Sequence, residues 1–167
     1  MALSANVKVS INATLTKTAD FESASSAIAH ALSLAFSDGT AAGQADRIFK
    51  DTRTLAASAT EDLDLSGALT NIYGETVVFA DVRAILITAD AANTNNVNVT
   101  RPASNGLPLF LAASDGVAVR PGGAFLYVAR DATGIPVTAG TGDLLTLTNS
   151  AGSTSVTYSI TVIGASA

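Results

Sequence analysis

Hydrophobic and polar residues alternate with a period of two near both ends of the chain. In the first of these stretches the apolar positions are Val7, Val9, Ile11, Ala13 and Leu15. In the second they are Val156, Tyr158, Ile160 and Val162, with Thr and Ser between them. Successive side chains of a β-strand point to opposite faces, so the alternation predicts two half-buried strands. Many of these residues are β-branched, which also favours strands.

Turn-forming residues divide the rest of the chain into short segments. Gly adopts positive φ without strain, and Asn and Asp tolerate it, so pairs such as Asp38-Gly39, Asn105-Gly106 and Asp115-Gly116 predict chain reversals. The segments between the turns predict strands at about 31–37, 46–55, 62–65, 76–89, 96–101, 107–112, 117–120, 124–130, 143–149 and 154–163. Short strands that follow one another at this spacing are typical of a sandwich or barrel.

The segment from Val77 to Thr88 is apolar at nearly every position. This pattern predicts a central strand that is covered on both faces. Its two charged residues, Asp81 and Arg83, are two positions apart and share one face. The simplest interpretation is a local ion pair, of the common and energetically weak kind.

The segment from Asp20 to about Ala31 is the one candidate for a helix, with Asp20 as a possible N-cap. Its serines disfavour the helix, so a loop is the alternative. We divide the chain into residues 1–30, an N-terminal strand with a connecting segment, and residues 31–167, a β-sandwich domain. The strand at Val7–Leu15 is either an arm that reaches a neighbouring molecule or an ordinary edge strand.

Many short strands with apolar faces need a second sheet to cover the first. We therefore expect an all-β fold, an antiparallel β-sandwich of jelly-roll or related Greek-key topology. An immunoglobulin-like sandwich is the structural alternative, although the Cys and Trp residues that mark that fold are absent from the sequence.

Composition narrows the classes of function. The chain has 167 residues, a formal net charge of −5, nine Lys and Arg residues in total and no Cys. The basic residues are scattered, whereas binding to nucleic acid requires a clustered basic surface, so we expect no direct nucleic-acid partner. No apolar run approaches the ~20 residues of a membrane span, and the first residues lack the pattern of a signal peptide. We expect a soluble protein without a membrane partner.

Candidate catalytic and metal-binding groups are few. His30 is the single histidine, and no partner motif accompanies it, so it is best interpreted as structural or simply exposed. Asp62 and Asp64 share one face of a predicted strand, which suits a solvated strand edge; a calcium site is the alternative, and catalysis a weaker one. We therefore predict no catalytic, cofactor-binding or metal-binding residue, no cofactor, and no enzymatic activity.

Other motifs also have ordinary explanations. Gly140-Thr141-Gly142 precedes a predicted strand instead of a helix, so it is a turn and not a phosphate cradle. Carbohydrate-binding sandwiches often stack sugars on exposed aromatic rings, and the chain offers Tyr73, Tyr127 and Tyr158. Tyr127 and Tyr158 alternate with core positions, so we expect both to be buried.

Several segments, taken in order, resemble small virion structural proteins of tailed bacteriophages. They are 38–49 (DGTAAGQADRIF), 51–58 (DTRTLAAS), 62–70 (DLDLSGALT), 78–85 (VFADVRAI), 119–126 (VRPGGAFL), 135–149 (IPVTAGTGDLLTLTN) and 157–164 (TYSITVIG). The resemblance covers roughly residues 31–164 and is greatest to jelly-roll decoration (cement) proteins of the phage head. The motifs are turns and strands without a diagnostic site.

The resemblance implies a capsid decoration protein, made in the cytoplasm of the host bacterium and located on the capsid surface of the virion. Its implied partners are the major capsid protein and further copies of itself in a homo-oligomer. It carries over no catalytic residue. A structural component of the tail, neck or baseplate, or a carbohydrate-binding module for host recognition, is the alternative.

Overall fold

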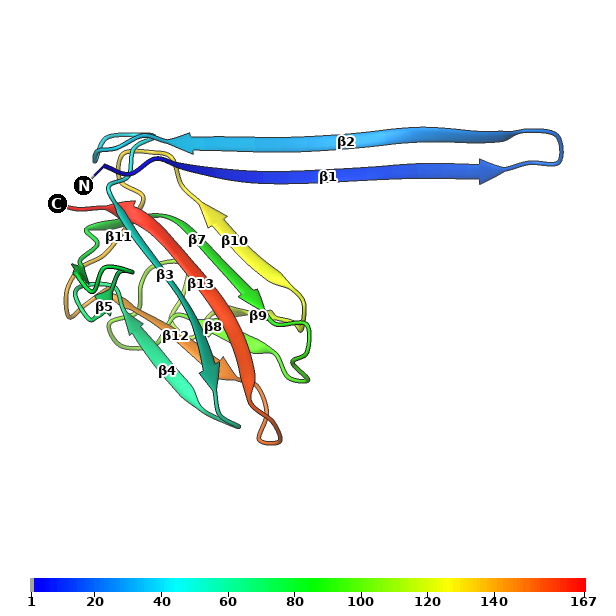
Figure 1. The fold of residues 1–167 in the computed structure, drawn as a ribbon. Helices are drawn as coiled ribbons and strands as arrows, with labels where there is room; N and C mark the ends of the chain where they lie inside the picture. The colour runs from blue at the N-terminus through cyan, green and yellow to red at the C-terminus, as the bar shows by residue number, and fades with distance from the viewer. Residues whose placement is uncertain (1) are drawn as a thin grey trace.

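The computed structural model describes residues 2–167, and every regular element in this range is a β-strand (Figure 1). The expected all-β fold is confirmed. Two parts are distinct in Figure 1: a body of packed sheets, and a long hairpin that projects from it. Within the described range, no helix has the length and hydrophobicity needed to cross a membrane.

The body contains two main sheets and one small one. The first main sheet has the order β10-β7-β13-β3, and β11 also pairs with β7. Its strands are β3 (Arg47–Leu55), β7 (Asp81–Ala89), β10 (Ala124–Val128), β11 (Ile135–Pro136) and β13 (Val156–Ala165). The second has the order β4-β12-β8-β9, from β4 (Thr60–Asp64), β8 (Val97–Thr100), β9 (Gly116–Val119) and β12 (Leu144–Asn149). The small sheet pairs β5 (Leu69–Thr70) with β6 (Thr76–Val77).

All strand pairs in the main sheets are antiparallel, and their pairing is nested along the chain. β3 pairs with β13, β4 with β12, β7 with β10, and β8 with β9. The chain therefore passes repeatedly from one main sheet to the other, and its first and last body strands lie side by side. The antiparallel β-sandwich expected from the alternating pattern is confirmed.

The core lies between the two main sheets. Ile85 and Ile160 from the first sheet and Val99, Leu145 and Leu147 from the second are all fully buried and belong to one apolar cluster. Full burial of a side chain of this size contributes about 1.5–3 kcal/mol relative to leaving it in water. The alternation of β13 thus corresponds to a strand with one face in the core, as expected.

A bulge in β7 explains why this strand is buried at four successive positions. Gly164 of β13 is opposite Val82, whereas Ile163 is opposite Ala84, so the register skips Arg83. On the other side of β7, β10 ends with Val128 opposite Ala84 and β11 begins with Ile135 opposite Val82, so Arg83 lies between the two. A bulge redirects the side chain of the extra residue, and here Val82, Arg83, Ala84 and Ile85 are all buried.

The projecting hairpin consists of β1 (Ala5–Thr18) and β2 (Ser23–Phe36), paired from Ala5↔Phe36 to Thr18↔Ser23. Both the helix considered for Asp20 to about Ala31 and its loop alternative are therefore wrong from Ser23 onward, where β2 begins. Apolar residues at 28, 32, 34 and 36 do alternate, but Ala fills most positions between them and hides the period of two. The strand predicted at 107–112 is also wrong, because this segment forms no strand. It contains Pro108, whose backbone nitrogen has no hydrogen to donate to a neighbouring strand.

Candidate functional site

The hairpin of β1, β2 and their turn (residues 5–36), called the arm from here on, has two chemically different faces. Paired residues of antiparallel strands lie on the same face, so the register assigns each residue to one side. The apolar face carries Val7, Val9, Ile11, Ala13, Leu15, Ile28, His30, Leu32 and Leu34. The opposite face carries Asn6, Lys8, Ser10, Asn12, Thr14, Thr16, Ser25, Ala27, Ala29, Ala31 and Ser33.

The outer half of the apolar face is in contact with water. Ile11, Leu15, Ile28 and Leu32 keep 59%, 67%, 54% and 45% of their surface exposed. At the tip, Phe21 is fully exposed between Asp20 and Glu22. An isolated two-stranded hairpin is at best marginally stable in water. A contiguous exposed apolar surface of this kind marks an interaction site.

The base of the arm is attached to the body by a small second core. Phe36, at the end of β2, is buried with Ala45, Ala84 and Ile163, and Val7 packs against this cluster. The guanidinium of Arg130 lies 5.8 Å from the centre of the Phe36 ring, a distance that suits a cation–π contact. The direction of the arm is therefore defined by side-chain packing at its base.

Backbone hydrogen bonds hold the loop that follows β2. The N–H of Ala45 donates to the carbonyl of Ser37 (2.8 Å), and the N–H of Gly43 donates to the carbonyl of Arg130 (3.0 Å). At the start of the chain, the N–H of Leu3 donates to Oδ1 of Asp38 (2.8 Å). Both ends of the arm are thus fastened to the same part of the body.

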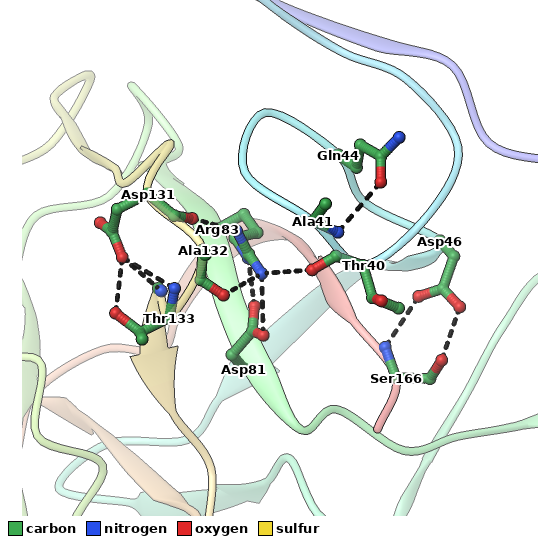
Figure 2. Close-up of polar contacts among 11 residues, drawn as sticks. Thr40, Ala41, Gln44, Asp46, Asp81, Arg83, Asp131, Ala132, Thr133 and Ser166 are labelled. Carbon is green, nitrogen blue, oxygen red and sulfur yellow. Dashed lines mark hydrogen bonds and ion pairs between the residues drawn. The ribbon is translucent and has the colours of Figure 1, made fainter.

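Arg83 links this loop to the body from inside (Figure 2). Its side chain is completely buried, and its guanidinium pairs with Asp81. It donates to the carbonyls of Thr40 (3.0 Å) and Ala132 (2.8 Å), and also to that of Asp131. The expected Asp81–Arg83 ion pair is confirmed, but a buried guanidinium with three carbonyl partners is a structural joint and not a weak surface pair.

The loop of Asp131 completes the joint. Oδ1 of Asp131 accepts hydrogen bonds from the hydroxyl of Thr133 (2.6 Å) and from the N–H groups of Thr133 (2.9 Å) and Gly134 (2.8 Å). The hydroxyl of Thr133 and the two N–H groups stabilise the charged form and lower the pKa of Asp131 to about 2. Gly134 has a φ of +53°, and a Cβ there would lie 2.7 Å from the carbonyl oxygen of Val82, so this position requires Gly.

A groove of about 700 Å³ lies between the arm and the body. One wall is the run of β1 from Asn6 to Ser10. The floor is formed by Ala84, Leu86, Ala124, Leu126, Thr161 and Ile163, on the outer face of the first main sheet. In Figure 1, β1 is the strand of the arm nearer the body, and the space between arm and body widens toward the tip.

The outer face of this sheet changes character along the strands. The cross-strand rows nearest the arm base are Val128–Ala84–Ile163–Ile48 and Leu126–Leu86–Thr161–Lys50. Farther away, hydroxyl pairs connect Thr52 with Ser159 (2.7 Å) and Thr54 with Thr157 (3.0 Å). The apolar side chains of this outer face are therefore concentrated beneath the arm. Ala84 and Leu86 form the second apolar face of β7. The arm covers this face at Ala84, whereas Leu86 keeps 39% of its surface exposed.

The structure places the candidate catalytic residues far from one another. His30 is exposed on the arm, opposite Ile11. Asp62 and Asp64 lie on β4, an edge strand, where Asp62 is exposed and accepts a hydrogen bond from the hydroxyl of Thr146 (2.5 Å). Within residues 2–167, no group of three or more His, Asp or Glu side chains is arranged to hold a metal ion.

The other sequence candidates are also accounted for. Gly140 and Thr141 form a turn, in which the N–H of Gly142 donates to the carbonyl of Thr138 (2.8 Å). Tyr158 is buried as expected, Tyr127 is half-buried, and Tyr73 is exposed in the turn between β5 and β6. Burial and a hydrogen bond from Tyr158 to Glu61 (2.5 Å) raise the pKa of the Tyr158 hydroxyl well above its usual range.

The sequence predicted only the last part of β2, as a strand at about 31–37, and it predicted neither the first part of β2 nor the joint at Arg83. The signal for β2 was the apolar period of two from Ile28 to Phe36. No sequence signal distinguishes a bulge that turns Arg83 inward from a regular strand. Comparisons with protein-family models, with curated proteins and with solved structures find no match for this chain. The resemblance to phage decoration proteins therefore stays a prediction, and the arm with its groove is the candidate site.

Proposed function

We propose that this chain is a non-enzymatic structural protein of a tailed-bacteriophage virion, namely a decoration protein that binds the major capsid protein on the head surface and stabilises the shell. The observation that carries the proposal is the arm. It extends from the body over strands of 14 residues each, and it presents an uncovered apolar face and a fully exposed Phe21. Such an element is built to contact another protein.

Physical considerations support this role. A shell offers many identical sites, so modest contacts made by every copy add up to a stable lattice. An exposed strand edge can extend a sheet of a neighbouring protein. The resemblance over residues 31–164 supports the assignment to the head. The nested pairing of β3 with β13, β4 with β12, β7 with β10 and β8 with β9 supports a jelly-roll topology for the body.

Binding of the purified chain to undecorated capsid shells tests the proposal. The chain should co-sediment with the shells, and the melting temperature of the shells should rise in calorimetry. The variant Phe21→Ser should bind more weakly, by about ten-fold or more, because it removes the large apolar side chain at the tip. Ile72→Ser is the matched control, since Ile72 is 81% exposed but belongs to a loop of the body.

The proposal fails if shells neither retain the chain nor gain thermal stability. Retention by purified tails or baseplates, and not by shells, would place the protein at the other end of the particle. Glycan-array signals that disappear in Tyr73→Ala would instead indicate a host-recognition module, because Tyr73 is the exposed tyrosine among the three.

A further inference from the structure

We propose that the groove between the arm and the body is occupied by the arm of a second copy of this chain, and that the two arms pair antiparallel through their β1 edges. The inference rests on the proposed function because it takes the arm as the binding element. It goes further in naming a second copy as the partner, an antiparallel orientation of the two arms, and the groove as the binding site. The resulting four-stranded sheet has the order β2-β1-β1-β2. It leaves both tips, with Phe21, available to the shell.

The first observation is the free edge of β1. Among the described residues β1 pairs with β2 alone, so its other edge has unpaired N–H and C=O groups. The groove is lined by five consecutive residues of β1, Asn6 to Ser10. Because consecutive residues point to opposite faces, a wall that contains all five is the edge of the strand and not one face. The groove therefore opens onto hydrogen-bonding groups that can accept a further strand.

The second observation is the apolar floor. A strand added to the edge of β1 would have one face toward the floor of Ala84, Leu86, Ala124, Leu126 and Ile163. That strand should carry apolar side chains on this face and polar side chains on the other. The arm has this pattern, and its apolar face points to the body, as the contact of Val7 with the Ala84 cluster shows.

The third observation is that β1 is complementary to itself. A two-fold axis normal to the arm near Ile11 sets Val9 beside Ala13 of the second copy, and Val7 beside its Leu15. The apolar row of one strand then continues in the other, and polar residues such as Ser10 and Asn12 face each other on the opposite side. The outer part of β1 from one copy enters the groove of its neighbour, where Leu15 packs over Leu86 and Leu126.

The charge of the groove agrees with this arrangement. In the two cross-strand rows nearest the arm base, the one charged residue is Lys50, so the outer part of the incoming β1 meets no carboxylate there. A two-fold pairing also closes on itself, and so uses up the exposed β1 edges without forming a filament.

A cysteine scan tests the geometry directly, because the natural chain contains no Cys. Single Cys substitutions at Val7, Val9, Ser10, Ile11, Asn12, Ala13 and Leu15 of the full-length chain are oxidised in the absence of shells. Across a two-fold axis, only a residue near the axis approaches its own copy closely enough for a disulfide. Disulfide-linked dimers should therefore peak at one position from Ser10 to Asn12 and fall away toward Val7 and Leu15.

The matched controls are the residues of β2 directly across from the expected axis, substituted as Ala29→Cys, His30→Cys and Ala31→Cys. They are exposed on the same arm but lie away from the β1 edge, so they should give few dimers. Equal cross-linking from β1 and β2, or no peak along β1, would overturn the proposed pairing.

Sedimentation equilibrium of the unmodified chain provides a second measurement that does not depend on any variant. The wild-type chain should form dimers, and Leu86→Thr with Leu126→Thr should raise the dimer Kd by about ten-fold or more, since each change affects both grooves. Ile72→Thr should leave the Kd unchanged. A wild-type chain that stays monomeric overturns the inference even if it binds shells, whereas a dimer that ignores shells refutes only the proposed function.

Discussion

The arm and the body contain strands of the same pattern in opposite surroundings. On β13, Tyr158, Ile160 and Val162 alternate with polar residues and are at most 1% exposed. On β1, Ile11 and Leu15 alternate in the same way and keep more than half of their surface in water. In the body, a second sheet covers the apolar face of β13, whereas no second sheet in the described part of the chain covers the apolar face of the arm. Period-two hydrophobicity therefore indicates which face must be covered, but not which molecule covers it.

The largest expected effect concerns the joint between these two regions. Arg83→Met should lower the free energy of unfolding by about 3–5 kcal/mol, because it leaves Asp81 and three carbonyls without their buried partner. Urea denaturation measures this loss. Arg120→Met, at an exposed position, should change stability by less than about 0.5 kcal/mol. Equal effects of the two substitutions would show that Arg83 is not the joint.

A second pair of variants compares the regions directly. Ile160→Ala in the core should cost about 2–5 kcal/mol, because it opens a cavity between the main sheets. Ile28→Ala on the arm should cost less than about 0.5 kcal/mol in the monomer, because Ile28 is already 54% exposed. Thermal melting at protein concentrations too low for association provides the measurement. A large loss from Ile28→Ala would mean that the arm is covered within a single chain.

The smallest expected effect depends on pH and on the Asp131 loop. Hydrogen bonds lower the pKa of Asp131 from 3.8 to about 2, so its contribution to stability is present above pH 3.8 and is lost as the pH falls through 2. Asp131→Asn should therefore make the stability less dependent on pH between these values, as followed by acid titration of the melting temperature. Asp20→Asn removes a carboxylate at the arm tip and should keep the wild-type slope; a similar flattening there would contradict the assignment.

The sequence predicted the sandwich better than the joint. The sequence shows the alternation at β1 and β13 and the two apolar faces of β7. These features depend only on the direction of successive side chains along one strand, so the sequence alone is enough to recognise them. The inward turn of Arg83 depends on a bulge and on two distant loops that supply its carbonyl partners. The groove requires two segments, Asn6–Ser10 and the outer face of the first main sheet, whose relative position follows from packing around Phe36.

The sequence by itself determined that the chain forms strands, that they stack in two layers, and that both β1 and β7 have an apolar face in need of cover. These properties are local, since they follow from the side chains along one strand. Tertiary structure alone decided that residues 5–36 leave the body as an arm, at an angle set by Phe36 and Arg83. That decision depends on contacts between residues distant in the chain, because only folding brings Thr40, Asp131 and Ala132 to the guanidinium of Arg83.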